Sequence, residues 1–554
     1  MRWEIINKLQ ITNYKLQITD IIDILLKNRG LKTEKQIKNF LNPQNPLKMK
    51  PEDFGVSKSQ ITKAVTRIRK AVKNKEHIIV WGDYDSDGIC GTAILWETLY
   101  QMGAKVLPYI PDRITEGYGF NVESIQKLKN QDSELKLLIS VDHGITAHQK
   151  IEYAEKLGIQ TIVTDHHEPT KKNPPALAVI HTQEISGTAV AWVLAKALGA
   201  PKQKLKADLA LCALGIVGDV MPVVGKARGF IKYGIEELKK TTRPGLVAIF
   251  ENTGLDSQRI GTYEIGYIIN PRINAKGRME HAIESLRLLC TKDKNKAAEL
   301  AKKMEISNQE RQSLLDGTVE QAKALYVSSN KLIFLADESF HFGVIGLVAG
   351  KLVEEFYRPA IVVSKGETYS KASARSINGF NIIEAIRTCS DLLVDAGGHP
   401  MAAGFTIETA KLEILKSKLE KLAEQQLDEQ KLTKTLKIDC ELNLENLSDD
   451  LYEKFSQFEP FGIGNPEPIF TSRVVVKNLR TVGTDGKHLK LTLSPAPNIP
   501  NIPNYPAIAF SLGYLVDKLK VDQEIEVAYN LSLNLWNSEK KLELKLKDIK
   551  CAQD

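Results

Sequence analysis

The sequence predicts a multidomain α/β protein with a parallel-sheet domain, a long connecting helix, a smaller α/β domain and a C-terminal β-barrel of the OB type. At 554 residues the chain is long enough for three or four such units. Apolar strands alternate with helical segments from His77 onward, which is typical of a parallel sheet covered by helices on both faces. After residue 431 the pattern changes to short strands separated by turns, which favours a small barrel.

The composition excludes several classes of protein. Hydrophobic residues make up 43% and charged residues 26%, as in soluble globular proteins. No apolar run is long enough for a membrane span or a signal peptide, so we expect a cytoplasmic protein with no membrane partner. The six cysteines are far apart, which argues against disulfides and zinc knuckles. The net charge of +7 permits a polyanionic partner without proving one.

The N-terminal segment divides into two parts. Residues 1–20 contain a short repeat, Lys-Leu-Gln-Ile-Thr at positions 8 and 15, and we treat them as an appendage. Residues 21–75 have helical periodicity, with a break at Arg29 and Gly30 and a basic amphipathic stretch over residues 58–75. We expect them to form a helical N-terminal cap.

The first strand of the parallel-sheet domain, residues 76–282, ends in alternating acids. Ile78 to Val80 is apolar, and Asp83, Asp85 and Asp87 follow it directly. The carboxyl ends of strands are where ligands bind in open α/β sheets, and crowded carboxylates repel one another unless a cation holds them. The alternative for this segment alone is a surface acidic turn or a helix cap.

The same arrangement recurs further along the chain. The expected strand 135–141 ends at Asp142, and the expected strand 159–164 ends at Asp165, His166 and His167. A fourth acidic position, Asp219, follows the apolar segment 209–217 after the three strand ends. One such acid is usually a turn residue or a cap, but parallel strands end at one edge, so these side chains can converge. Carboxylates with imidazole and without thiolate favour Mn²⁺ or Mg²⁺ over structural zinc.

Four segments resemble motifs I to IV of the DHH phosphoesterase superfamily, in order. They are Asp83-Tyr-Asp-Ser-Asp-Gly88, Val141-Asp-His-Gly144, Asp165-His-His167 and Gly218-Asp-Val-Met-Pro222. Four later stretches, 270–279, 374–376, 396–404 and 459–468, are similar to the RecJ family of bacterial single-strand-specific exonucleases. The resemblance runs from about Ile21 to the C-terminus. It is imperfect at His143, where motif II more often has Cys, at Gly218, where Ala is usual, and at 180–182, where Ile-His-Thr replaces Val-Asn-Pro.

The resemblance implies a catalytic centre with two divalent ions, Mn²⁺ or Mg²⁺. Its ligands would be Asp83, Asp85, Asp142, His166 and Asp219, with Asp142 as the bridge. Two such ions activate water and neutralise charge on the attacking and leaving oxygens. His167 would face the scissile phosphate as an electrophile or proton donor, Asp165 would orient its neighbours, and Asp87 would have a structural role.

The resemblance also implies substrate-binding residues on both sides of a groove. A loop over 270–279 would carry Arg272 and Arg278, and residues 283–327 would form a helix that connects to a DHHA1 domain over 328–430. We expect the groove to be too narrow for duplex DNA. The residues expected to face nucleic acid are Arg113, Arg278, Arg375, Ser376 and His399.

Residues 431–554 are expected to bind single strands through basic and aromatic side chains. We expect strands over 474–479, 489–493, 507–511, 524–535 and 542–547. The basic and aromatic side chains available are Phe455, Phe458, Phe461, Phe470, Arg473, Lys477, Arg480, Lys487, His488 and Lys490. Several of the phenylalanines must belong to the core.

The function implied by the resemblance is a single-stranded-DNA-specific 5′ to 3′ exonuclease that releases 5′-mononucleotides in DNA repair and recombination. A helicase and a single-strand-binding protein are the implied protein partners. Two alternatives remain: a related DHH enzyme that acts on oligoribonucleotides or cyclic dinucleotides, and a non-enzymatic DNA-binding scaffold. The C-terminal barrel argues against the first, and the complete ligand set argues against the second.

Overall fold

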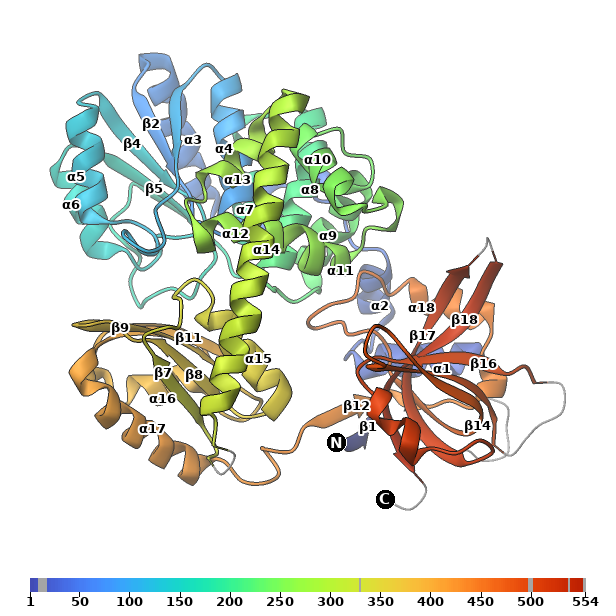
Figure 1. Ribbon diagram of the computed structural model, residues 1–554. Coiled ribbons are helices and arrows are strands. Elements are labelled where there is room, and N and C mark those ends of the chain that lie inside the picture. The colour runs from blue at the N-terminus through green and yellow to red at the C-terminus, as the bar shows by residue number, and fades with distance from the viewer. Residues whose placement is uncertain (8–16, 328–329, 497–501, 537–538, 552–554) are drawn as a thin grey trace. The chain divides into compact units, whose positions relative to one another are not determined.

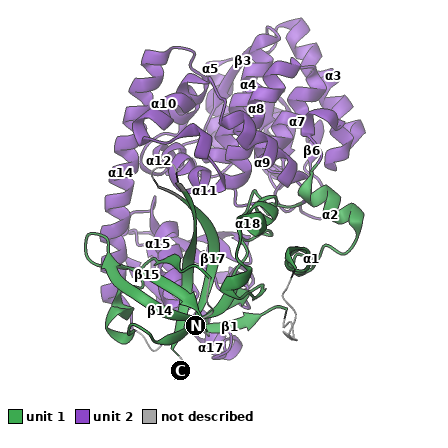
Figure 2. Cartoon of the chain, turned by 90° about the vertical axis from the view of Figure 1, so that its right-hand side faces the viewer, with its two compact units in different colours: residues 1–43, 222–224, 434–554 green, residues 44–221, 225–433 purple. Residues whose placement is uncertain are grey.

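A computed structural model describes residues 1–7, 17–327, 330–496, 502–536 and 539–551 (Figure 1). The chain forms two compact units (Figure 2). One contains residues 1–43, 222–224 and 434–554, and the other contains residues 44–221 and 225–433. Within the described ranges, no helix is both long and apolar enough to cross a membrane.

The larger unit contains the predicted parallel sheet, with strand order β3-β2-β4-β5-β6. The apolar runs that predicted these strands are buried almost throughout, as expected where helices cover both faces. The prediction is confirmed for each strand that we named. The bounds are β2 (His77–Trp81), β3 (Lys105–Tyr109), β4 (Leu135–Ser140), β5 (Gln160–Asp165) and β6 (Ala178–His181).

Helices cover this sheet, and one of them reaches the acidic edge. Helix α4 begins at Ser86, directly after the acidic turn, and ends at Gln101. It packs on α7 and α8. Helices α5 and α6 pack on each other, away from α7 and α8, and α6 contacts β5 (Figure 1). The bounds of the surrounding helices are α3 (Lys58–Asn74), α5 (Val122–Gln131), α6 (His148–Lys156), α7 (Gly187–Leu198), α8 (Lys202–Gly218), α9 (Gly225–Leu238) and α10 (Pro244–Thr253).

Two segments differ from what the sequence suggested, and a third had no predicted element. The third is the apolar segment before Asp219, which is the end of α8, a helix that is buried along most of its length. The stretch Asn270–Met279 is helix α12 and not a loop. Pro271 is compatible with this helix because it lies in the first turn, where its missing N–H costs no hydrogen bond. The short helix α11 (Thr262–Glu264) and a π-helix, η4 (Ile265–Ile269), lead into it. The connecting region is two helices, α13 (Ile283–Cys290) and α14 (Lys294–Leu325).

The second sheet of the larger unit has the order β10-β11-β9-β8-β7. Strands β7 and β8 pair in parallel, and the remaining pairs are antiparallel. Gly397 and His399 lie in β10 as part of this sheet. The bounds are β7 (Ile333–Asp337), β8 (Ala360–Ser364), β9 (Tyr369–Arg375), β10 (Leu393–His399), β11 (Ala402–Glu408), α15 (Ile345–Phe356), α16 (Ile382–Arg387) and α17 (Leu412–Gln426).

The smaller unit is the predicted β-barrel. Its sheet has the order β13-β14-β15-β16-β18-β17, and an additional pairing of β14 with β17 closes it. The five predicted strands are all present. The bounds are β13 (Cys440–Glu441), β14 (Phe470–Val482), β15 (His488–Pro495), β16 (Tyr505–Ala509), β17 (Glu524–Trp536), β18 (Glu539–Cys551) and α18 (Asp449–Ser456).

The N-terminal segment is not organised as the sequence suggested. Strand β1 (Arg2–Ile5) pairs in parallel with β12 (Thr435–Ile438), so residues 1–20 are not simply an appendage. The repeat falls mostly on residues 8–16, outside the described ranges. The expected cap over 21–75 is divided: α1 (Ile18–Asn28) and α2 (Glu34–Leu41) contribute apolar residues to the core of the barrel unit, while α3 belongs to the larger unit.

All six cysteines lie in the described ranges and have free thiols, as expected. Four of them are buried.

Candidate metal centre

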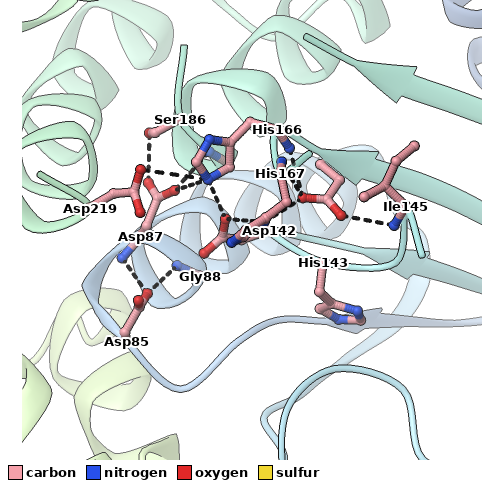
Figure 3. Close-up of polar contacts among 12 residues, drawn as sticks. Asp85, Asp87, Gly88, Asp142, His143, Ile145, His166, His167, Ser186 and Asp219 are labelled. Atoms are coloured by element: carbon pink, nitrogen blue, oxygen red, sulfur yellow. Dashed lines mark hydrogen bonds and ion pairs between the residues drawn. The ribbon is translucent and has the colours of Figure 1, made fainter. Parts of the chain in front are cut away.

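The predicted acids and imidazoles converge at the carboxyl edge of the parallel sheet (Figure 3). Asp83 lies two residues beyond β2, Asp142 lies two residues beyond β4, and Asp165 ends β5. Asp85 is the N-cap of α4: its Oδ1 accepts hydrogen bonds from the N–H groups of Asp87 and Gly88 over 2.9 and 3.1 Å. The helix-cap interpretation therefore holds for Asp85, and the same residue also belongs to the cluster.

Three overlapping groups of side chains could each hold a metal ion, with ligand atoms within 4.8 Å of one another. Asp83, Asp85 and Asp142 form one group. The other two share His166 and are Asp142 with His166 and His167, and Asp87 with His166 and Asp219. Asp219 is brought into the cluster by the end of α8, where it is the C-cap residue. All five predicted metal ligands are thus together, and Asp142 belongs to two groups.

His166 lies at the centre of the cluster. Its Nε2 is 3.1 Å from Oδ1 of Asp142 and 3.6 Å from Oδ2 of Asp219. Neither Nε2 of His166 nor Oδ1 of Asp142 nor Oδ1 of Asp83 has a hydrogen-bond partner among the described residues, although all three atoms are buried. Buried polar atoms are normally satisfied. These orphaned atoms, all oxygen or imidazole nitrogen, fit divalent Mn²⁺ or Mg²⁺ ions.

The protein alone does not balance the charge of this cluster. Burial, together with the neighbouring acids, raises the pKa of Asp83 and of Asp142 well above the usual range. The same causes raise the pKa of Asp219 to about 8. Burial lowers the pKa of His166, so its imidazole favours the neutral form that can coordinate a metal. The raised pKa values mean that the charged carboxylates are unfavourable in the protein alone. A bound cation would stabilise their charged form, so the site favours cations.

Asp87 has a structural position. Its carboxylate is fully buried and accepts hydrogen bonds from Oγ of Ser186 and from the N–H groups of Gly187 and Thr188, over 2.7, 2.7 and 3.0 Å. These groups form the N-terminus of α7, so Asp87 ties α4 to α7 and satisfies N–H groups that a helix leaves free. Its Oδ2 lies 3.7 Å from Nε2 of His166.

Asp165 holds His167 in a fixed orientation. Nδ1 of His167 donates to Oδ1 of Asp165 over 2.8 Å, and the carboxylate also accepts from the N–H groups of Ile145, His166 and His167. Burial alone would raise the pKa of Asp165, but these hydrogen bonds outweigh it and lower that pKa. Burial would likewise lower the pKa of His167, yet the contact with Asp165 raises it to about 9.

The backbone around the cluster is tight. Asp142 has a φ of +70°, in the left-handed region that non-glycine residues rarely adopt. A side chain at Gly187 would place its Cβ 2.4 Å from Oδ1 of Asp142, and one at Gly88 would lie 2.5 Å from the N atom of Asp83. Only glycine permits these close approaches. The strained aspartate and the two glycines together fix where the carboxylates point.

Arginines gather beside the acidic turn. Arg113 lies over the ring of Tyr84 at 4.9 Å and over that of Phe342 at 5.7 Å, and its Nε has no hydrogen-bond partner among the described residues. Burial, with Arg113 and Arg375 nearby, lowers the pKa of Arg278 to about 9. Burial and Arg113 lower the pKa of Arg375 too. Three guanidinium groups of one sign kept together favour an anionic ligand.

The other predicted substrate-binding residues differ in position. The ring of His399 stacks on that of His167 with centroids 6.3 Å apart, so the second sheet contributes directly to the metal edge. Ser376 is buried, and its hydroxyl donates to the carbonyl of Phe380 over 2.6 Å, so in this structure its side chain supports the backbone. Arg272 donates to Glu305 in an ion pair.

Sequence reasoning missed two residues near the cluster, and His143, which departs from motif II, lies outside it. Tyr118 donates its hydroxyl to the carbonyl of Asp142 over 2.8 Å and lies 3.3 Å from Nδ1 of His167. Its position between Gly117 and Gly119, both with positive φ, was the available signal. Ser186 is identified only by its hydrogen bond to Asp87 in the structure. His143 points away from the cluster: its Nε2 donates to the carbonyl of Trp81 over 2.9 Å (Figure 3).

Comparisons with known families match three regions of the chain. Residues 77–216 match the DHH family N-terminal domain, residues 327–425 match the DHHA1 domain, and residues 438–548 match the RecJ OB domain. The three regions follow one another in this order along the chain.

Characterised relatives and solved structures agree with these matches. The single-stranded-DNA-specific exonuclease RecJ of Bacillus subtilis is 33% identical over 99% of this chain and 70% of its own length. The crystal structure of RecJ from Thermus thermophilus in complex with Mn²⁺ has a TM-score of 0.81 and 29% identity, over 96% of this chain and 76% of that chain. The structure of the same protein with Mg²⁺ has a TM-score of 0.75 and 27% identity, over 96% of this chain and 74% of that chain.

Proposed function

The chain belongs to the RecJ family of single-stranded-DNA-specific exonucleases, and we propose that it hydrolyses single-stranded DNA from the 5′ end and releases 5′-mononucleotides. The observation that carries this proposal is the group of buried, unpaired ligand atoms on Asp83, Asp142 and His166. Family membership supplies the substrate, and these atoms supply a reason to expect metal-dependent hydrolysis in this chain.

We infer that Asp83, Asp85, Asp142, His166 and Asp219 hold two divalent ions, Mn²⁺ or Mg²⁺, with Asp142 shared between them. The bound ions would activate water and neutralise charge on the phosphate. This inference is supported by the three ligand groups, in which Asp142 occurs twice. It is supported as well by the solved RecJ structures that contain Mn²⁺ or Mg²⁺.

His167 is the proton donor in this proposal. Its Nδ1 is occupied by Asp165, so Nε2 is the ring atom left to face a substrate. The bond between phosphorus and the 3′ oxygen of the terminal nucleotide breaks, and Nε2 gives its proton to that oxygen. Asp165 keeps the ring in place and stabilises its protonated form, while Tyr118 supports the Asp142 backbone. His399, stacked on His167, limits the space available to the leaving nucleotide.

The 5′ polarity is supported by the arginine cluster of Arg113, Arg278 and Arg375. A terminal phosphate carries more negative charge than an internal phosphodiester, so it benefits most from several guanidinium groups. Cleavage of the bond to the 3′ oxygen leaves a new 5′-phosphate on the shortened strand. The same cluster can therefore bind the substrate again for the next cleavage.

The preference for single strands would come from a groove between the DHH and DHHA1 domains that is too narrow for duplex DNA. Lys371 supports this placement, since it lies over the ring of Phe342 at 4.7 Å and donates to the carbonyl of Ile114 over 3.1 Å. The two domains thus meet beside the arginine cluster. The barrel would add affinity for longer strands, with the salt sensitivity of phosphate contacts.

The biological setting follows from the same proposal. An enzyme of this kind requires free single strands, so we expect it to act in DNA repair and recombination, in the cytoplasm, after an unwinding enzyme. A helicase and a single-strand-binding protein are its proposed partners. A DHH enzyme for cyclic dinucleotides or short RNA is less well supported, because the barrel has no evident use on such substrates.

A degradation experiment tests the proposal. With Mn²⁺, a 5′-labelled single strand should release its label at once as a mononucleotide, while a 3′-labelled strand should give a ladder. Duplex DNA, a cyclic dinucleotide and dinucleotide RNA should be cut slowly or not at all. Asp142→Ala should abolish cleavage and leave strand binding in EDTA intact, and Asp256→Ala, an exposed acid, serves as control. Early release of the 3′ label, or equal cutting of duplex, would exclude the proposed activity.

A further inference from the structure

A second concave site lies on the larger unit, remote from the metal centre. It encloses about 830 Å³, a volume in the range of small-molecule sites. Helix α4 separates the two: Asp85 caps its first turn at the metal centre, whereas Trp96 and Tyr100 line the pocket near its last residue. At about 1.5 Å per residue, Trp96 and Tyr100 lie about 16 to 23 Å from Asp85 along the axis of α4.

One wall of this pocket is aromatic. Trp96 and Tyr100 are one helical turn apart, and their rings stack with centroids 5.5 Å apart and planes inclined by 27°. The Trp96 indole is half-buried and donates to the carbonyl of Val106 over 3.4 Å, which fixes its orientation. Tyr100 is 64% exposed. The pair therefore offers a flat, rigid surface on which a planar ring can stack.

The rest of the pocket has positive charge to offer. Lys240 and Lys292 are exposed and form no ion pair among the described residues, and Lys206 lies 3.5 Å from Glu237. The other acid in the wall, Glu97, is already held by Arg243 over 2.7 Å and by Lys204 over 3.5 Å. The free charges of the pocket are thus ammonium groups.

The N-terminus of helix α10 lies beside the same wall. Helix α10 begins at Pro244 and has no side chain that caps its N-terminus, and Thr241, Thr242 and Arg243 line the pocket just before it. Pro244 has no N–H and Leu246 donates its N–H to the carbonyl of Arg243, so the contribution of this helix end is its dipole, which is positive at the N-terminus and favours an anion nearby. The lysines and this helix end together form a place for a phosphate group beside the aromatic wall.

We propose that this pocket binds a nucleotide, with its base stacked on Tyr100 and its phosphate held by Lys240 and Lys292. A planar base uses the ring pair, and a phosphate uses the free lysines and the start of α10. Neither an aliphatic ligand nor a bare anion would use both. The ligand is a free mononucleotide or one nucleotide of a longer strand, and both present the same chemistry to the pocket.

Photo-crosslinking tests this site independently of cleavage. The full-length protein in EDTA, which prevents hydrolysis, is irradiated with 8-azido-adenosine monophosphate, and the modified peptides are identified by mass spectrometry. We expect adducts in residues 96–101 or 240–244 that excess dAMP suppresses and inorganic phosphate does not. Labelling that is confined to the peptides of the metal centre or the arginine cluster would overturn the proposal.

Matched variants locate the contacts. Tyr100→Ala should weaken dAMP binding at this site on the order of 10- to 100-fold, as loss of a stacking partner does. Lys292→Ala should weaken it less. Tyr369→Ala and Lys127→Ala change exposed residues elsewhere in the same unit and should have no effect. Binding that is unchanged in Tyr100→Ala, or ribose 5-phosphate binding as tightly as dAMP, would contradict the stacked base.

One comparison tells whether the bound nucleotide comes from a strand or is a free mononucleotide. A second consideration separates this proposal from the proposed nuclease activity. A single-stranded oligonucleotide with one azido base labels the pocket more efficiently than the free probe if the source is a strand, and less efficiently if it is a mononucleotide. Because binding is measured without metal, an inactive nuclease would leave this result untouched. Conversely, a correct degradation ladder would stand even if the pocket failed to bind.

Discussion

Asp165 accepts a hydrogen bond of 2.8 Å from Nδ1 of His167, and this contact decides which nitrogen of the imidazole can serve a substrate. The carboxylate is itself held by three backbone N–H groups, so the pair behaves as one rigid element at the end of β5. A histidine whose orientation is fixed in this way can meet a leaving oxygen without reorganisation.

Replacing Asp165 should therefore impair turnover more than binding. In Asp165→Asn the amide keeps its size but no longer stabilises the protonated ring, so we expect kcat to fall by about 10- to 100-fold. Steady-state hydrolysis of single strands measures this, and strand affinity in EDTA should change little. Glu168→Gln, a nearby exposed acid, is the control. Equal kcat in the variant and the parent protein would rule out the positioning role.

Metal removal should destabilise the protein, increasingly so at higher pH. The pKa of Asp219 is about 8 in the folded metal-free protein and near 3.8 when unfolded, so the folded state binds more protons between these values. Stability from this group is present below about pH 4 and is lost as the pH rises through 8. We expect the Tm in EDTA to fall from pH 6 to pH 8.5, and Mn²⁺ to raise the Tm most at pH 8.5. A gap between the two conditions that does not depend on pH would contradict this.

Much of the metal centre could be predicted because of how parallel sheets are built. Asp83, Asp142 and Asp165 each follow an apolar run, and strands that run in parallel end at one edge. Asp219 also follows an apolar segment, as predicted, but that segment is a buried helix, to which the argument from parallel strands does not apply. Residues that are buried on every side carry no periodicity that separates helix from strand.

Long-range contacts were out of reach of the sequence. The partners of Asp87 lie about a hundred residues away, and no local pattern indicates them. Pro271 and Gly277 suggested a loop where α12 forms. The helix is possible because Pro is tolerated in a first turn, and Gly277 lets the helix approach the carbonyl of Tyr84. In the barrel unit, Phe455, Phe458 and Phe470 are core residues, a fact that only the tertiary fold reveals.

The variant Asp87→Asn tests whether the carboxylate of Asp87 stabilises the fold through its hydrogen bonds or destabilises it by repelling the neighbouring carboxylates. If Asp87 mainly repels its neighbours, the neutral variant should have a higher Tm in EDTA. Because Asp87 accepts from Ser186 and two N–H groups of α7, we instead expect the variant to lose stability, by about 1–3 kcal/mol for each buried donor left unsatisfied. Denaturant unfolding measures the change, and Asp256→Asn is the exposed control. A more stable Asp87→Asn protein would refute the structural role.

Arg278→Met should raise the stability of the protein and weaken its binding of substrate. Burial and the neighbouring arginines lower the pKa of Arg278, so its charge is unfavourable in the folded protein without a ligand. We expect a higher Tm, together with about 10- to 100-fold weaker binding of a 5′-phosphorylated strand. Binding of a 5′-hydroxyl strand should change much less. Arg387→Met, on the exposed side of α16, should alter neither quantity, and an equal loss for both strands would contradict the terminal-phosphate assignment.

Among the described residues of the barrel unit, Phe510 and Tyr514 are exposed aromatic side chains on which a base can stack, and the sequence did not single them out. They are 55% and 64% exposed. The ring of Phe510 lies 5.2 Å from that of His488, whose Nδ1 accepts from the N–H of Ser511. Lys518 lies 5.9 Å from the Tyr514 ring. This combination of exposed rings and basic groups is typical of single-strand binding.

Phe510→Ala and Tyr514→Ala should each weaken the binding of long single strands by about 5- to 100-fold, because each removes a surface on which a base can stack. Fluorescence anisotropy with strands of increasing length measures this, and the loss should vanish for a dinucleotide. Neither variant should lower the Tm, whereas Phe470→Ala, in the core, should cost about 3–5 kcal/mol of stability. Val521→Ala, which is equally exposed but not aromatic, should bind normally. If the two surface variants keep full affinity for long strands, stacking in this unit occurs elsewhere, because exposed rings that contact a strand cannot be removed without a loss.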